Sequence, residues 1–170
     1  MNQPVISKGE ESMKNNFKAL LMHFIIVALS FIFLVIFVAT GPKTGKYTTN
    51  IISRVFIGSM FILAYIFSGT LLDRDANQKY DFFVGIFVGI IGIVLWFYIF
   101  SKTRVNLFEV IPKELSGPWI LVNIYYTPFV LIDFLFGLPN IPILSLATNL
   151  IPTLLMGLGL KYKRLKYKNN

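Results

Sequence analysis

The sequence predicts an all-α fold, a polytopic membrane bundle of about five transmembrane helices. Only 14% of the 170 residues are charged and 55% are hydrophobic, with a mean hydropathy of +0.68. Soluble domains carry about 25% charged residues, so this composition is typical of a membrane protein. Five apolar segments are long enough to cross a hydrocarbon core, which takes about 20 helical residues. They show no in/out alternation, which excludes a β-barrel.

The five segments run over residues 19–40, 51–72, 82–100, 118–137 and 140–160. The first is longer than the apolar core of a cleaved signal, about 7–15 residues, so we expect a retained helix. Trp96 and Tyr98 close the third segment and Trp119 opens the fourth, where aromatic rings favour the headgroup level. We therefore expect one transmembrane domain over 19–160, between a polar N-terminal tail (1–18) and a basic C-terminal tail (161–170).

Residues 118–160, which include the last two segments and the turn between them, contain five of the chain's eight prolines and a single charge, Asp133. Pro128 and Pro152 lie near the segment centres, where a proline removes an N–H and clashes with the preceding turn. The sequence predicts that the two segments form a proline-kinked hairpin, turning at Leu138–Pro139. Whether residues 118–160 cross once or twice remains open at this point.

Polar side chains gather around these prolines and form a candidate cavity. One interpretation is that they only bond the backbone groups that the kinks set free. The other is a small site for a neutral or zwitterionic solute, at broken-helix positions like those of transporters. Asp133 lies about 6 Å from the end of its segment, which favours a structural carboxylate over ion coupling. The candidate residues are Asn123, Tyr126, Thr127, Pro128, Asp133, Ser145, Thr148, Asn149 and Pro152.

The third segment carries Gly85, Gly89 and Gly92, spaced four and three residues apart on one helix face. Small residues let another helix approach closely in lipid, where packing drives association. These glycines predict a helix-packing face, within the protomer or between protomers.

The basic tail is expected to contact anionic lipid headgroups, as cations beside a membrane helix do. With five crossings, one side would hold eleven lysines and arginines and the other five, so the N-terminus lies outside and the C-terminus in the cytoplasm. If residues 118–160 cross only once, an internal N-terminus becomes the better solution. The tail cations are Lys161, Lys163, Arg164, Lys166 and Lys168.

Several kinds of chemistry are not expected. The chain has no cysteine, and its single histidine, His23, is expected to be a neutral residue near the membrane interface. The sequence contains no glycine-rich phosphate loop, and its cations flank apolar runs, so neither nucleotide hydrolysis nor nucleic-acid binding is expected. We expect no cofactor, no metal site and no catalytic residues.

These observations favour a small non-enzymatic protein of a cell membrane, and a composition rich in Lys, Asn, Ile and Phe suits a bacterial genome rich in A and T. The protein would be an accessory, immunity-type or membrane-complex subunit that packs against a membrane-protein partner or a second copy of itself. The alternative is a small solute or ion transporter, or a substrate-binding transporter subunit, that uses the polar residues of the fourth and fifth segments. A membrane enzyme is the third hypothesis.

Overall fold

The computed structural model describes residues 8–41, 43, 45, 50–74 and 78–168, and this part of the chain contains helices and no strand. The helices in chain order are α1 (Lys8–Ala39), α3 (Ile51–Thr70), the 3-10 helix η1 (Gln78–Phe83), α4 (Ile86–Thr103), the 3-10 helix η2 (Lys113–Leu115), α5 (Ser116–Tyr125), α6 (Thr127–Phe136), α7 (Pro142–Thr148) and α8 (Ile151–Lys168).

Four helical stretches of the described chain are long and apolar enough to cross a membrane. They are Gly9–Ala39, Ile51–Thr70, Gln78–Thr103 and Pro142–Lys168, and a fifth results if the bent pair α5–α6 counts as one span. The prediction of an all-helical chain is therefore confirmed. Of the predicted five membrane-spanning helices, the structure shows four to five that are long and apolar enough.

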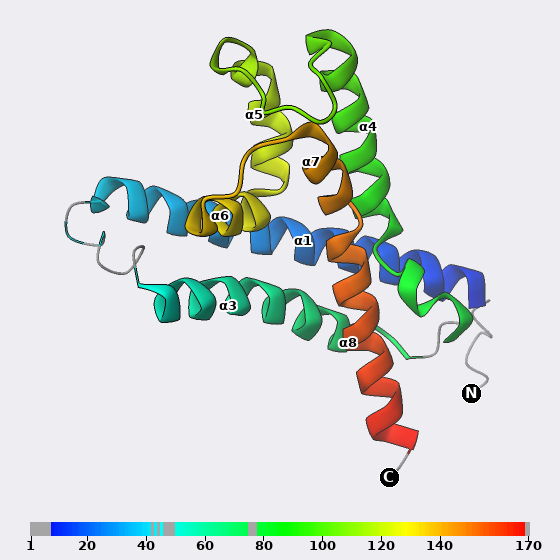
Figure 1. The fold of residues 1–170 in the computed structure, drawn as a ribbon. Coiled ribbons are helices and arrows are strands. Elements are labelled where there is room, and N and C mark those ends of the chain that lie inside the picture. The colour runs from blue at the N-terminus through cyan, green and yellow to red at the C-terminus, as the bar shows by residue number, and fades with distance from the viewer. Residues whose placement is uncertain (1–7, 42, 44, 46–49, 75–77, 169–170) are drawn as a thin grey trace.

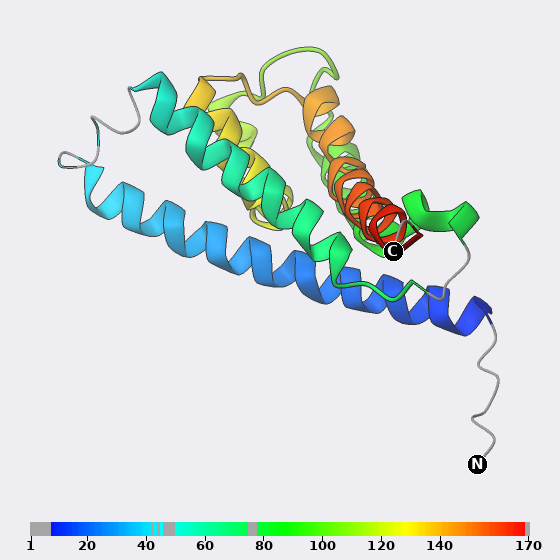
Figure 2. The same ribbon diagram turned by 90° about the horizontal axis from the view of Figure 1, so that it is seen from below.

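The helices form two groups that cross at a steep angle (Figures 1 and 2). Helices α1 and α3 run side by side in opposite directions. Helix α4 runs beside α7 and α8, which follow each other closely and are called the α7–α8 arm here. Helix α8 crosses α3, while α6 packs against both α1 and α3.

The predicted fourth segment, 118–137, is not one kinked helix. It consists of α5 and α6, which differ in direction by 113° at a break on Tyr126. A change of more than a right angle sends α6 back toward the end of the molecule where α5 begins. The sequence could not predict this angle, because it depends on the packing of α6 against α1 and α3.

Pro128 and Pro152, at which we expected kinks, lie in the first turns of helices, and so does Pro142. Pro128 is the second residue of α6, Pro142 the first of α7 and Pro152 the second of α8. The N–H groups of a first turn have no partner within the helix, so proline costs little there. At Pro128 the expected kink is therefore a helix start with a bend of 113°, whereas the break before Pro152 lies within the stretch Pro142–Lys168, which is long enough to be one span.

The helices also extend beyond the predicted apolar domain at both ends. Helix α1 begins at Lys8, so residues 8–18 are helical rather than a separate tail, whereas residues 1–7 lie outside the described residues. Helix α8 continues through Lys168 and includes most of the predicted basic tail, up to the described boundary.

One end of the molecule joins the first part of α1, the residues after α3 and the last part of α8. Lys18 and Asp73 form an ion pair at 2.6 Å, and Lys163 donates a 2.6 Å hydrogen bond to the carbonyl of Leu72. The Arg164 guanidinium lies 2.9 Å from the carboxylate of Asp81 in η1. We call this the terminal end, because both described termini lie near it (Figure 1).

The opposite end joins two connections that lie far apart in sequence. The N–H of Ile111 donates to the carbonyl of Asn140 at 3.0 Å, and the N–H of Ile143 donates to the carbonyl of Leu107 at 3.1 Å. The connection that precedes α5 is thus bonded to the connection that follows α6. We call this the loop end, and the α5–α6 pair both leaves it and returns to it.

Candidate functional site

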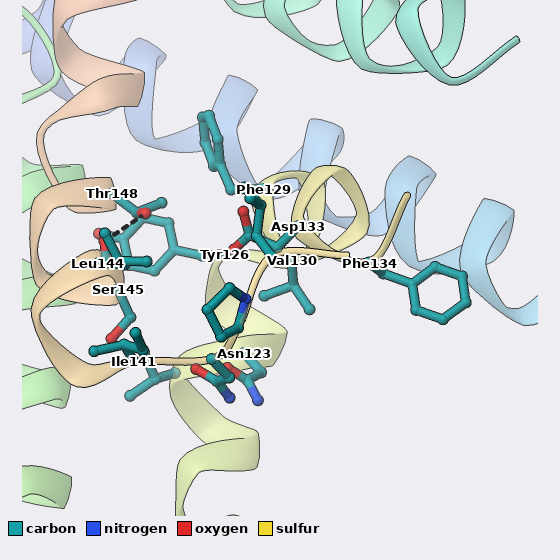
Figure 3. A pocket seen from close by; sticks show the side chains of 14 residues that line it. Asn123, Tyr126, Phe129, Val130, Asp133, Phe134, Ile141, Leu144, Ser145 and Thr148 are labelled. Carbon is teal, nitrogen blue, oxygen red and sulfur yellow. Dashed lines mark hydrogen bonds between the residues drawn. The ribbon is translucent and has the colours of Figure 1, made fainter. Parts of the chain in front are cut away.

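A pocket of about 190 Å³ lies between the α5–α6 bend and α7, and we call it the polar pocket (Figure 3). It reaches from the connection at 138–141 to the bend at Tyr126. The polar side chains that line it are Asn123, Tyr126, Asp133, Asn140, Ser145 and Thr148. Five of these are among the nine candidates named from the sequence, and Asn140 was not.

The local structure of the bend explains why the pocket exists. The Thr127 hydroxyl donates to the carbonyl of Ile124 at 2.7 Å, satisfying the carbonyl that Pro128 leaves without a donor. Because α6 then turns away from α5, the side chains of Asn123 and Asp133 lie on either side of the angle between the two helices. Thr127 and Pro128 are buried behind the bend and do not line the pocket.

Helix α7 supplies the other wall with two hydroxyl groups. Thr148 donates to the carbonyl of Leu144 at 2.9 Å, and Ser145 donates to the carbonyl of Pro142 at 3.0 Å. The indole N–H of the buried Trp96 also donates to the Ser145 hydroxyl, at 3.1 Å, which fixes α7 against α4. The Thr148 and Ser145 oxygens retain accepting capacity toward the pocket.

The polar pocket carries one negative group and no lysine, arginine or histidine in its lining. Asp133 is half-buried, and within the described chain its carboxylate has neither an ion pair nor a hydrogen bond. The Asn123 carboxamide likewise makes no hydrogen bond to the described residues. An unpaired, half-buried carboxylate beside amide groups is suited to a ligand that donates hydrogen bonds or carries positive charge.

A buried polar cluster lies on the far side of Tyr126. His23 is 0% exposed, and its Nδ1 lies 2.9 Å from the hydroxyl of Tyr65. Its Nε2, the Tyr126 hydroxyl and both polar atoms of the Asn149 carboxamide have no hydrogen-bond partner in the described part of the chain. Buried polar atoms of this kind are nearly always bonded in native proteins, so four of them in one place are unusual. Asn149, a candidate named from the sequence, is buried and does not line the polar pocket.

The predicted glycine face packs within the protomer. A Cβ on Gly92 would overlap the Tyr126 hydroxyl and lie 2.5 Å from the Asn149 Oδ1, and one on Gly89 would lie 3.5 Å from the Asn149 carbonyl. Gly85 precedes α4 in a left-handed conformation with φ of 84°. Its N–H donates to Asn16 Oδ1 at 2.9 Å and its carbonyl accepts from the Thr153 hydroxyl at 2.9 Å.

The cations of the basic tail fall into two groups. Lys163 and Arg164 are half-buried. Lys163 contacts Leu72, which follows α3, and Arg164 contacts Asp81 in η1. Lys161 lies over the ring of Phe82. Lys166 and Lys168 are exposed in the last turns of α8. The five cations thus do not form one exposed patch.

Sequence reasoning missed the residues that hold the buried cluster together. His23 was expected near an interface, but α1 begins at Lys8, so His23 lies in the middle of this helix and is fully buried. Tyr65 stands among many aromatic residues and gave no separate signal. One feature of the sequence could have indicated that this face of α1 is buried. Small and polar residues recur on it among large apolar ones: Asn16, Ala19, His23 and Ser30.

No known protein family matches this chain, and neither do characterised proteins or solved structures.

Proposed function

We propose that this protein is a multi-pass membrane protein with four crossings and one re-entrant helix pair. The crossings would be α1, α3, η1–α4 and the α7–α8 arm. Helices α5 and α6 have ten residues each, half of what a spanning helix needs. The hydrogen bonds that tie the connection before α5 to the one after α6 support a pair that enters and leaves on the same side.

Four crossings put both termini on one side, which agrees with the ion pairs and hydrogen bonds of the terminal end. In this arrangement the terminal side carries ten lysines and arginines and the loop side six. The positive-inside rule then favours a cytoplasmic N-terminus and a cytoplasmic C-terminus. The sequence alone predicted five crossings and an external N-terminus. We propose this four-crossing topology in its place.

Single cysteines test this topology, because the chain contains none of its own. The variants Lys8→Cys, Lys113→Cys and Lys168→Cys would be treated in intact cells with a membrane-impermeant maleimide. We expect labelling at position 113 and protection at 8 and 168. Labelling at 8 with protection at 168 would instead support five crossings and refute the re-entrant pair.

Within this arrangement, we propose that the polar pocket binds the polar group of a small ligand. The protein would act as a solute transporter or as the substrate-binding subunit of one. The observation that carries this proposal is the unpaired carboxylate of Asp133, facing a pocket lined by uncharged amides and hydroxyls. Binding without catalysis fits this lining, since catalysis usually combines several cooperating ionisable groups.

The second candidate function is an accessory or immunity-type subunit that packs against a partner helix. Gly89 and Gly92 do not support it, because they already contact Asn149 inside the protomer. The large exposed side chains of α1 and α3, including Leu29 and Phe56, offer surface for a partner or for lipid tails. Lys166 and Lys168 would serve as contacts for anionic headgroups in either case.

Thermal unfolding of the purified protein with short solutes tests the ligand proposal. Ethanolamine, glycine and glycerol represent a cation, a zwitterion and a neutral donor. We expect at least one to raise the unfolding temperature, as any ligand specific to the folded state does. For Asp133→Asn, the solute concentration that gives the same rise in unfolding temperature should be at least about tenfold higher. This is the effect expected for the loss of a hydrogen bond to a charged group.

Glu114→Gln is the matched control, because this exposed carboxylate lies at the loop end but outside the pocket. It should leave the stabilisation unchanged. If no solute stabilises the protein, or if both variants respond alike, the proposal of a ligand in the polar pocket is wrong. Without solute, the Asp133→Asn variant should unfold at the same temperature as the unaltered protein. A loss of stabilisation by solute then reflects lost binding and not a damaged fold.

A further inference from the structure

A second hollow borders the polar pocket and shares part of its wall. This hollow, about 240 Å³ in volume, lies between α3, α6 and α8, and we call it the apolar groove. Phe129, Asp133 and Thr148 line both hollows. The two spaces therefore meet at Asp133 and Thr148, where α6 faces the α7–α8 arm (Figure 3).

The two hollows have opposite chemistry. The polar pocket offers the Asn123 and Asn140 amides and the Ser145 hydroxyl. The other residues lining the apolar groove are all aliphatic: Ile62, Ile132, Ile151 and Leu155. A ligand that fills both would have a polar head on one side of Asp133 and a hydrocarbon chain on the other.

The charge of the head follows from the residues around Asp133. Neither hollow contains a lysine, arginine or histidine, so the carboxylate lacks a positive partner in the described lining. The rings of Tyr126, Phe129 and Phe134 also line the polar pocket, and aromatic faces attract cations. An ammonium head satisfies the carboxylate, the amide oxygens and the rings together, whereas an anionic head would be repelled by Asp133.

The outer wall of the apolar groove is open to the molecule's surface. Ile62 is 38% exposed and Ile151 is 36% exposed, on a part of α3 and α8 that would face lipid in the proposed membrane arrangement. A ligand dissolved in the bilayer could reach Asp133 sideways along this groove without first entering water. Partitioning into the bilayer also raises the local concentration of an amphiphile.

We propose that the polar pocket and the apolar groove form one site for a membrane-resident, single-chain amphiphile with an ammonium head. The head binds Asp133 and the Asn123 amide, and the chain lies between Ile62 and Leu155. This inference rests on the proposed function, since it assigns the class of ligand that the polar pocket binds. It adds that the ligand arrives from the bilayer rather than from water.

Photo-crosslinking of the full-length protein in nanodiscs of zwitterionic lipid, which has no net charge, tests the proposal. The test ligands are dodecylamine and dodecanoic acid, each with a diazirine at the end of the chain. We expect saturable crosslinks from the amine to α3 near Ile62 and to α8 near Leu155, and none from the acid. Butylamine should compete only at concentrations at least about tenfold higher than dodecylamine does.

Two pairs of variants separate the head from the chain. Asp133→Asn should weaken dodecylamine crosslinking by about tenfold or more, while Glu114→Gln leaves it unchanged. Ile62→Trp should block the groove and reduce dodecylamine crosslinking by a similar factor, without changing ethanolamine binding in the polar pocket. Leu63→Trp is its control, because Leu63 is 60% exposed and does not line the groove.

Three results would overturn the proposal: equal crosslinking by the acid, crosslinks spread without saturation over the whole apolar surface, or no effect of Ile62→Trp. If ethanolamine still bound in an Asp133-dependent way, the polar pocket would remain a ligand site and only the amphiphile would be refuted. Because Ile62 is partly exposed, the bulky variant is expected to fold, and a gel-filtration profile like that of the unaltered protein checks this.

Discussion

The two ends of the α7–α8 arm are packed in opposite ways. Where α8 crosses α3, the contact is so close that a Cβ on Gly69 would overlap the Met156 carbonyl and one on Gly159 would overlap the Ile66 carbonyl. Where α7 faces the α5–α6 bend, the same arm borders a pocket of about 190 Å³. The arm is thus closely packed where α8 crosses α3 and leaves space at the loop end. Stability and ligand binding should therefore depend on different residues.

Gly159→Leu tests the α3–α8 crossing and should have the largest effect. The added side chain would overlap the backbone of Ile66, which cannot move aside as a flexible side chain could. We expect a loss of about 3 kcal/mol in the free energy of unfolding, typical of severe overpacking. Gly117→Leu is the control, because no atom lies within 4 Å of its Cβ position. Equal unfolding midpoints for the two variants in detergent would show that the crossing is not tight.

Arg164→Met tests the ion pair that fixes α8 to η1 beside this crossing. Asp81 is 4% exposed, so its carboxylate would lose its 2.9 Å partner while remaining buried. We expect a loss of about 2 kcal/mol, somewhat less than for fully buried pairs because the Arg164 side chain keeps 15% exposure. Equilibrium unfolding measures it, with Lys166→Met on the exposed face as control. If Arg164→Met and Lys166→Met behave alike, the pair does not hold the terminal end.

Acidification tests the outer ion pair of the terminal end. The Lys18 ammonium, 2.6 Å from the carboxylate, holds the pKa of Asp73 below its ordinary value of 3.8. Its stabilisation is therefore complete above pH 3.8 and is lost as the pH falls through the lower pKa of the folded state. Since 38% and 39% of the two side chains are exposed, we expect only about 0.5 kcal/mol.

The measurement is the free energy of unfolding from pH 6 down to pH 2 for the unaltered protein and for Lys18→Met. The variant should lack this part of the decline, and high salt should reduce the difference between the two proteins. A decline of the same size in both proteins would assign the acid sensitivity to other groups.

Asn123→Ala tests the open end and should have the smallest effect on stability. Its carboxamide faces the polar pocket and makes no hydrogen bond to the described residues, so truncation leaves no partner unsatisfied. We expect a change within about 0.5 kcal/mol in the free energy of unfolding, together with weaker binding of the test amines. A large loss of stability would mean that the pocket wall supports the fold, and the contrast between the two ends would disappear.

The sequence predicted the parts of the fold that depend on local composition. Most residues of the apolar runs over 19–40, 51–72, 82–100 and 140–160 are helical in the structure, although the last run is broken between Thr148 and Ile151. Runs this long and this apolar favour a helix whatever lies around them. It also named Asn123, Tyr126, Asp133, Ser145 and Thr148, which the structure brings around one pocket. These residues could be named because polar side chains are rare in that part of the chain.

The remaining features depend on contacts between distant residues. A proline inside an apolar run is compatible with a kink or with the start of a second helix, and only the packing of α6 on α1 and α3 decides for the 113° bend. Lys18 pairs with Asp73, which lies 55 positions later in the sequence. Arg164 pairs with Asp81, which lies 83 positions earlier. No periodicity of the sequence encodes such pairs, so the proximity of the two termini could not be predicted.

In the four-crossing arrangement that we propose, the bend at Tyr126 also affects how the chain can be assembled during synthesis. Insertion machinery releases a segment into lipid when the segment is long enough to cross, and neither half of the α5–α6 pair meets that length. If the pair is re-entrant as we propose, it would pack against α1, α3 and α4, which emerge earlier from the ribosome. The α7–α8 arm follows α6 in the chain and borders the pair from the other side. A chain cut before Pro142 would keep the surfaces that hold α6 but lose the wall that closes the polar pocket.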